Sequence, residues 1–240
     1  MNNSLTLLLT VYLFSINIIN GQSYDIEYLM SIDYGSSQVH TTYLQIISNE
    51  GSYALEVGSE YTSVYKMLPP SNQEKQFVLY LPHKSVIYNN QPIFSKIFIV
   101  KDKTPSMKWV MKPDTKDILG IKCQLAEVEF RGRKYNLWIS TDLSVVGGVW
   151  KFVGLPGYVM AAYSQDQKIA IEVKSITPSM KEIVTIDEIL KENKNEIVSW
   201  DSFEAKFRHT VEKLKKSYEA ESNSDIEHSF EIFQVEIIGQ

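Results

Sequence analysis

Alternation of apolar and polar side chains near the start of the chain limits the fold more than any other feature of the sequence. Apolar residues occupy every second position from Tyr24 to Tyr34, and the positions between them are polar apart from Leu29. This period of two predicts a long strand with one buried face, because successive side chains of a strand point to opposite faces. Turn residues at 35–37 and 49–51 then predict two returning strands, over residues 39–47 and 53–57.

The strand pattern continues through most of the chain. Further strands are predicted at 77–80, 94–100, 107–111, 121–130, 135–139, 158–163 and 169–173. We expect Asn89-Asn90 to mark the turn between the first two of these, residues 114–120 to form a connection, and Arg131-Gly132-Arg133-Lys134 to form a tight turn. The buried parity changes near Ala126-Glu127, which predicts a β-bulge there.

Near the C-terminus the periodicity becomes helical. Five apolar residues recur at spacings of three and four: Phe203, Phe207, Val211, Leu214 and Tyr218. Asp201 is the expected N-cap, with Glu204 completing a capping box, and residues 228–238 predict one more strand. The expected fold class is therefore α+β: a curved, mostly antiparallel and half-barrel-like sheet with a C-terminal amphipathic helix packed on it.

Residues 1–21 are interpreted as a secretory signal peptide, followed by a single domain over residues 22–240. The apolar run from Leu5 to Ile19 is shorter than the roughly 20 residues of a membrane span, and small Gly21 can precede a cleavage point. No Lys or Arg precedes the run, so an uncleaved anchor and a buried core helix remain alternatives. We expect a periplasmic or secreted protein with no membrane span after cleavage.

Composition excludes several classes of protein. A chain that is 44% hydrophobic and 22% charged is not broadly disordered. The net charge of −5 disfavours nucleic acid as a partner. One Cys excludes an internal disulfide framework, and four histidines far apart in sequence give no metal-ligand spacing: His40, His83, His209 and His228. Neither a metal nor a cofactor is predicted.

Several motifs follow one another in order within residues 107–176. They are Trp109; residues 119–123 with Cys123 and Ala126; Phe130-Arg131-Gly132-Arg133; Trp138; and finally Gly148, Lys151, Phe152, Gly154, Leu155, Pro156 and Gly157. This arrangement resembles the GLPGLI family of exported bacterial proteins. Val149 stands where the family has Pro, and Tyr158-Val159 replaces Leu-Ile, so both departures keep apolar character. The resemblance implies a β-rich exported protein, and the family has no established activity.

The glycine-rich segment 147–157 has two interpretations. Leu155-Pro156-Gly157-Tyr158 fits a type II turn. The apolar side chains of Trp150, Phe152, Leu155 and Tyr158 either plug one end of the sheet or form a binding rim for a hydrophobic ligand or an extended peptide. In either case structural roles fall to Gly132, Gly148, Gly154, Pro156, Gly157 and Cys123.

A small group of cations lies near the same motif. Arg131, Arg133 and Lys151, with Lys134, form either a solvated hairpin tip or an anchor for a carboxylate or phosphate head group. Cys123 lies on an apolar strand face, which predicts a buried and inert thiol rather than a nucleophile. No catalytic residue is predicted, and the chain is not expected to be an enzyme.

Three functions are compatible with these features. The first is a non-catalytic envelope protein that binds a hydrophobic ligand or peptide, which an apolar cavity under the helix would favour. The second is an accessory subunit of an outer-membrane transport or secretion system, which an exposed apolar patch around Trp150 would favour. The third is a hydrolase, which would need a cleft holding Cys123 or Asp142 beside a histidine.

Overall fold

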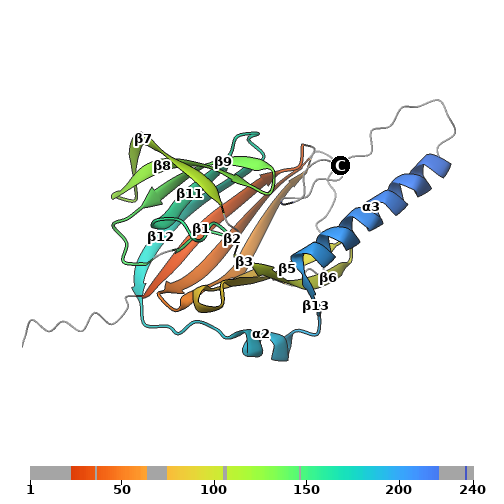
Figure 1. Ribbon diagram of the computed structural model, residues 1–240, viewed down its shortest axis with the longest axis horizontal. Helices are drawn as coiled ribbons and strands as arrows, with labels where there is room; N and C mark the ends of the chain where they lie inside the picture. The colour runs from red at the N-terminus through yellow and green to blue at the C-terminus, as the bar shows by residue number, and fades with distance from the viewer. Residues whose placement is uncertain are drawn as a thin grey trace, which may run out of the picture.

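One long, curled sheet dominates the fold (Figure 1). The computed structural model describes residues 23–35, 37–63, 75–104, 107–145, 147–221 and 236. The predicted signal peptide and the predicted strand at 228–238 lie outside these residues, except for Glu236. The elements are β1 (Ser23–Asp33), β2 (Ser37–Ser48), β3 (Gly51–Ser63), β4 (Phe77–Leu81), η1 (Pro82–Lys84), β5 (Val86–Ile93), β6 (Lys96–Lys103), β7 (Lys108–Ile118), β8 (Ile121–Phe130), β9 (Arg133–Ser140), β10 (Gly147–Gly148), β11 (Tyr158–Ser164), β12 (Ile169–Ser179), α2 (Ile186–Glu192), β13 (Glu196–Ser199) and α3 (Trp200–Glu221).

The strands follow the order β13-β6-β5-β4-β3-β2-β1-β12-β11-β9-β8-β7, with short β10 beside β11. Neighbouring strands are antiparallel except for the pairs β13–β6 and β10–β11. β1 lies in the middle of the order, between β2 and β12. The predicted class is therefore confirmed: a curled and mostly antiparallel sheet with a C-terminal helix packed on it.

The two faces of the sheet are covered by different parts of the chain. We call one face of the sheet the inner face. It carries Ile26, Gln45, Ala54 and Val78, which pair in this order across β1 to β4, and Val100 of β6, which is connected to Val78 through Asn89 of β5. The segment 145–157 fills part of this face. α3 packs on its β6 end through three buried side chains: Phe203, Phe207 and Val211.

The outer face carries a smaller cluster. Ile189 of α2 packs there on Phe77, Leu79 and Ile99, which alternate with the inner-face residues of β4 and β6. Neither α2 nor β13 was predicted, because each is too short to show a period in the sequence.

Three local expectations are wrong. Asn89-Asn90 lies inside β5, and the turn before that strand is formed by η1 and by Ser85, whose φ is 49°. Residues 114–118 extend β7, so the connection shrinks to a turn at 119–120. The pairing irregularity lies in β7, between Met111 and Thr115, because the pairing of β8 with β9 runs without a shift.

The N-cap of α3 also differs from the expectation. The helix begins at Trp200, and Ser199 Oγ accepts a hydrogen bond of 3.2 Å from the backbone N–H of Ser202. Asp201 therefore lies inside the first turn, where its negative charge still favours the positive end of the helix dipole. On the next turn Arg208 donates two hydrogen bonds to the carboxylate of Glu204, which therefore pairs along the helix rather than completing the predicted capping box.

Candidate binding pocket

The glycine-rich segment places large apolar side chains against the inner face. Phe152, Leu155 and Tyr158 are buried, and Trp150 is 7% exposed. The ring of Phe152 meets three other rings edge-on, those of Phe130, Tyr135 and Trp150. This burial agrees with the plug interpretation. Of the four residues considered for a binding rim, only Trp150 borders the pocket described below.

Two glycines of this segment make room for the backbone. A Cβ at Gly148 would lie 2.4 Å from the carbonyl oxygen of Phe152, and one at Gly157 would lie 2.3 Å from that of Ser140. Both contacts are too short for any side chain, so glycine is required by packing. The turn before Tyr158 is not type II, since the N–H of Gly157 donates to Leu155 at 2.8 Å and closes a three-residue turn about Pro156.

The remaining residues given structural roles are placed as follows. Gly154 has a φ of 79°, which favours glycine, and a Cβ there would make only an ordinary contact, 3.9 Å from Thr104 Cγ2. Gly132 and Arg131 have φ values of 81° and 50° and form the predicted tight turn between β8 and β9.

Arg131 and Lys151 belong to a buried ion cluster, which consists of Asp102, Arg131, Lys151 and Glu236. The ammonium of Lys151 lies 2.5 Å from Glu236 Oε2, and neither side chain is exposed. Arg131 pairs with both Asp102 and Glu236. Two positive and two negative charges therefore face one another inside the protein.

Burial and ion pairing shift the pKa values of this cluster in opposite directions. Desolvation lowers the pKa of the Lys151 ammonium below its ordinary value, although Glu236 acts in the opposite direction. Desolvation likewise raises the pKa of Asp102, although Arg131 acts to lower it. The guanidinium of Arg131 stacks 3.2 Å from the ring centroid of Trp200, the first residue of α3. The cluster thus joins the β8–β9 turn to β6 and to the start of the helix.

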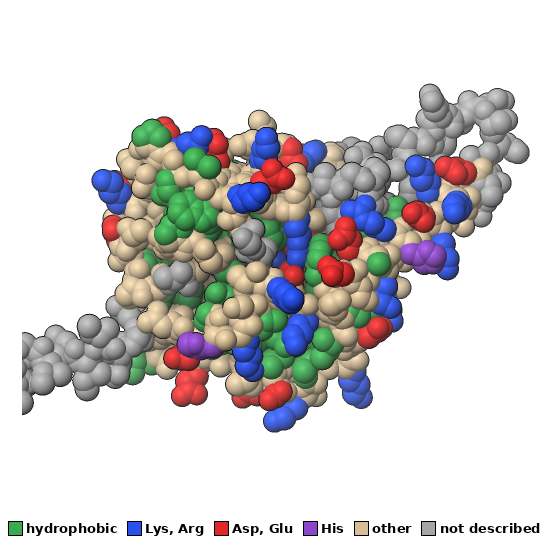
Figure 2. Space-filling view, viewed as in Figure 1, with side chains coloured by type: hydrophobic (Ala, Val, Ile, Leu, Met, Phe, Trp, Pro, Cys, Tyr) green, Lys and Arg blue, Asp and Glu red, His purple; other side chains and the backbone are tan. Residues whose placement is uncertain are grey.

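The cationic group was expected to be either a solvated hairpin tip or an anchor for an external carboxylate or phosphate, and the structure differs from both expectations. Arg131 and Lys151 are not a solvated hairpin tip, and the carboxylates that they hold belong to the chain itself. Arg133 is held separately, by an ion pair of 2.9 Å between its Nε and Asp166. On the side of the molecule shown in Figure 2, cations and acids are intermixed along α3 rather than gathered by sign.

A pocket of ≈ 380 Å³ opens on the inner face beside this cluster. Its wall is built from facing pairs on β2 and β3: Tyr43 with Glu56, Thr41 with Ser59, and Val39 with Tyr61. β5 and Phe207 of α3 face this wall across the pocket. Seven aromatic residues border it: Tyr34, Tyr43, Tyr61, Phe77, Phe94, Trp150 and Phe207. Of these, Phe77 belongs by its ring to the outer-face cluster of Ile189.

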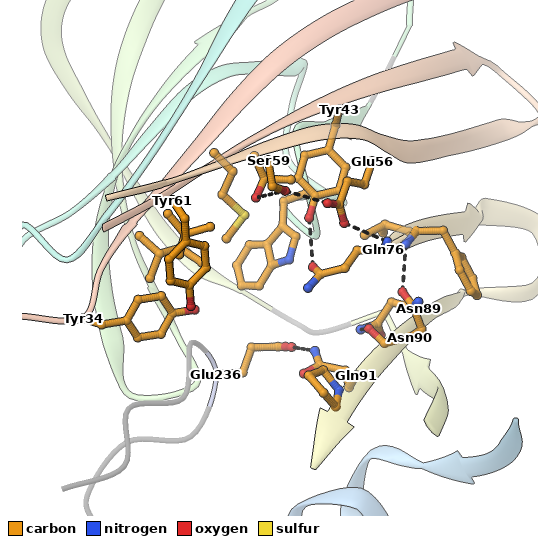
Figure 3. Close-up of a pocket in the computed structure, with 18 of the residues that line it drawn as sticks. Tyr34, Tyr43, Glu56, Ser59, Tyr61, Gln76, Asn89, Asn90, Gln91 and Glu236 are labelled. Atoms are coloured by element: carbon orange, nitrogen blue, oxygen red, sulfur yellow. Dashed lines mark hydrogen bonds between the residues drawn. The ribbon is translucent and has the colours of Figure 1, made fainter. Parts of the chain in front are cut away.

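Polar side chains line the other part of the pocket (Figure 3). Tyr43 Oη donates to Gln76 Oε1 at 2.9 Å. The carboxylate of Glu56 accepts hydrogen bonds from Ser59 Oγ at 2.5 Å and from the backbone N–H of Gln76 at 3.0 Å. Gln91 donates to Glu236, which connects the pocket wall to the ion cluster. The pocket thus combines aromatic faces with fixed amide and carboxylate groups.

Sequence reasoning missed the polar residues of this pocket. Glu56 and Asn89 carry no motif, and Asn89 was interpreted as a turn residue. One signal was available: Thr41, Gln45 and Glu56 occupy positions of β2 and β3 whose parity faces the core, where apolar residues are the norm.

Cys123 lies in β8 and is buried. Its thiol donates to the carbonyl oxygen of Ile121 at 3.4 Å, and burial raises its pKa to about 11. The thiol is therefore protonated at neutral pH, and it lacks the activation that a nucleophile needs. Of the histidines, His40 contacts Ser31, and His83 lies beside Glu50 on the surface.

Comparison with known proteins assigns no family. No family matches the chain, and no curated protein is similar to it. Among solved structures, PNGF-II is 14% identical with a TM-score of 0.49, and the match covers 77% of this chain. The chain spans about a third of the length of PNGF-II, 32% of it.

Two other solved structures are less similar still. An uncharacterized conserved protein from Thermus thermophilus is 9% identical, with a TM-score of 0.39 and 74% and 90% of the two chains covered. A DUF1329 family protein from Desulfovibrio piger is 11% identical, with a TM-score of 0.20 and coverage of 72% and 92%. Likenesses of this size say nothing about what the chain binds.

Proposed function

We propose that this chain is a non-catalytic binding protein of the cell envelope, which holds a hydrophobic ligand or a peptide in the inner-face pocket. The observation that carries the proposal is the pocket itself, a cavity with aromatic walls that is bordered by Phe207 of α3. Its volume lies within the range of about 300–1,000 Å³ that is usual for ligand sites. Aromatic walls bind apolar groups, and fixed amides orient a polar or peptide group beside them.

The envelope location rests on the sequence. The apolar run at 5–19 supports export, as does the resemblance of residues 107–176 to the GLPGLI family. Among the helices within the described residues, none has the length and apolar character that a membrane crossing requires.

An accessory docking subunit has less support. Trp150 is only 7% exposed, so its own side chain offers little surface for docking. β7 ends the sheet within the described residues and exposes Trp109 and Val110. However, β7 also carries Pro113 and a series of lysines, which are features that discourage another strand from pairing with an edge. A hydrolase has less support again, because the Cys123 thiol is buried and protonated.

The proposal is tested by purifying the protein from its native envelope and identifying co-purified molecules by mass spectrometry. Ser59→Trp fills the pocket, because Ser59 faces it from β3. Glu60→Trp places the same side chain on the opposite face of the same strand, where Glu60 is exposed. We expect a lipid or peptide that co-purifies with the wild type and with Glu60→Trp but not with Ser59→Trp.

Two results would count against the proposal. One is a folded wild-type protein that carries no ligand at any stage of a mild purification. The other is a ligand that is retained equally by both tryptophan variants, which would place its site outside the pocket.

A further inference from the structure

The charged side chains that line the pocket are all negative among the described residues. Its described lining residues include two carboxylates, Glu56 and Glu236, and neither Lys nor Arg. Glu236 is neutralised from behind by Lys151 and Arg131. Glu56 accepts hydrogen bonds only from neutral donors, and within the described ranges it forms no ion pair with Lys, Arg or His. A half-buried carboxylate thus faces the cavity without a counter-ion.

A second group in the pocket lacks a donor. Asn89 is 3% exposed, and its Oδ1 has no hydrogen-bond partner in the part of the chain that the structure describes. Asn89 pairs with Val78 across β4 and β5, so its side chain shares the inner face with that pocket residue. Figure 3 shows it at the pocket beside the side chains that surround Glu56. A buried acceptor of this kind is costly unless a donor reaches it.

The aromatic residues at the pocket opening favour the same kind of ligand. Tyr34, Tyr61 and Phe94 are partly exposed and line the pocket together with Trp150. The faces of aromatic rings attract cations, most strongly where water is excluded. Met30, Ile32 and Val39 supply an apolar wall against which methylene groups pack.

We propose that the pocket binds a primary alkylammonium group, with Glu56 as its counter-ion and Asn89 Oδ1 as an acceptor for one of its three N–H donors. This inference rests on the proposed function and specifies the chemistry of the ligand. The same chemistry occurs in the lysine side chain of a peptide and in a free alkylamine. A neutral polyol could use the same acceptors and rings, but it would leave the charge of Glu56 unpaired.

Isothermal titration with three probes of similar length tests this chemistry on the wild-type protein. The probes are pentylammonium, which is cationic; pentanol, which is neutral; and hexanoate, which is anionic. We expect pentylammonium to bind at least about tenfold more tightly than either of the others, since a half-buried ion pair adds to the packing that all three share. Nα-acetyl-lysine methylamide, compared with its norleucine analogue, then distinguishes a peptide ligand from a free amine.

The role of Glu56 is tested by matched variants. Glu56→Gln keeps the shape and the hydrogen-bond acceptor but removes the charge, and we expect it to reduce pentylammonium affinity to the level of pentanol. Glu60→Gln removes a charge from the opposite face of the same strand and should leave the affinity unchanged. Asn89→Ala should weaken pentylammonium more than pentanol. The comparison of probes on the wild type does not depend on any variant folding.

The outcomes separate the two proposals. Binding of pentanol or hexanoate as tightly as pentylammonium would overturn the ammonium assignment and leave the pocket as a binding site. An unchanged pentylammonium affinity in Glu56→Gln would do the same. If none of the probes binds while a co-purified ligand is lost from Ser59→Trp, only the ammonium assignment fails. If none of the probes binds and nothing co-purifies, both proposals fail.

Discussion

The ammonium of Lys151 lies 2.5 Å from a carboxylate oxygen of Glu236, which is 85 residues further along the chain, and neither side chain reaches solvent. Either charge alone in this environment would be strongly disfavoured, because a buried ion loses its hydration. The pair therefore joins residue 236 to the motif segment at 147–157. It also makes the stability of the fold depend on both partners together.

Lys151→Met and Glu236→Gln should each lower the free energy of unfolding by about 3–5 kcal/mol, since each leaves one unbalanced charge in the buried cluster of Asp102, Arg131, Lys151 and Glu236. The double variant restores neutrality and should cost about 2 kcal/mol less than the sum of the two single changes. Urea denaturation of the four proteins measures this coupling. Additive costs would mean that the two charges do not interact.

Gly148→Ala should destabilise the fold by about 1–3 kcal/mol, because the added methyl group meets the carbonyl oxygen of Phe152 at 2.4 Å and Val159 at 2.7 Å. Gly58→Ala is the matched control in β3, where a Cβ meets nothing within 4 Å. Thermal unfolding should separate the two variants clearly. Equal melting temperatures would show that the segment shifts to accept a side chain.

Phe203→Ala should cost about 3–5 kcal/mol, because this ring is buried against Phe98 and anchors α3 to the sheet. Leu214→Ala removes an apolar residue from an exposed position of the same helix and should change stability by less than about 0.5 kcal/mol. Hydrogen exchange of the α3 amides, with urea denaturation, measures both effects. Fast exchange of α3 in the wild type would contradict a docked helix.

Cys123 should resist alkylation in the folded protein. Its pKa of about 11 leaves only about one thiolate in a thousand at pH 8, and the side chain is buried. Iodoacetamide should therefore label it at a rate that rises steeply with urea, in parallel with unfolding. Rapid labelling in buffer would instead indicate an accessible thiol and would reopen the case for a catalytic role.

The ion pair of Arg133 with Asp166 determines whether acid raises or lowers the stability of the fold at this site. Partial burial acts to raise the pKa of Asp166, but hydrogen bonds from Ser164 and Arg133 outweigh it and lower the pKa below its ordinary value. A lowered pKa stabilises the fold above the unfolded value of about 3.9, and this contribution disappears as the pH falls through the folded pKa.

Asp166→Asn should therefore flatten the decline of stability below about pH 4, and Asp142→Asn, at an exposed loop position, should not. Chemical denaturation at a series of pH values compares the slopes of the three proteins. A wild-type slope that survives in Asp166→Asn would assign the acid response to other carboxylates.

Strand identity could be predicted where one face of a strand is apolar. The alternation from Tyr24 to Met30 appears directly in the burial of β1, and the spacing of Phe203, Phe207 and Val211 appears in the buried side of α3. These patterns can be read from neighbouring residues alone, because a strand or helix with one apolar face is buried on that face whichever apolar partner it meets.

The prediction failed where polar residues serve the interior. Asn89-Asn90 indicated a turn because asparagine usually satisfies its side chain through local backbone. In the structure, Asn90 instead accepts a hydrogen bond from the N–H of Phe77 and donates to the carbonyl oxygen of Lys75, both on a neighbouring segment. The ion cluster was equally out of reach, because its four residues come from four separate parts of the chain and each has an ordinary surface residue type.

The central position of β1 has a consequence for the time at which this protein folds. Ser23 aligns with Ser179 and Ile32 with Ile169, so β1 pairs on one side with β2, which directly follows it, and on the other side with a strand that is synthesised much later. Contacts so distant in sequence slow folding to milliseconds or longer in small domains. Slow closure of this pairing would keep a nascent chain unfolded for longer, which suits the export proposed above.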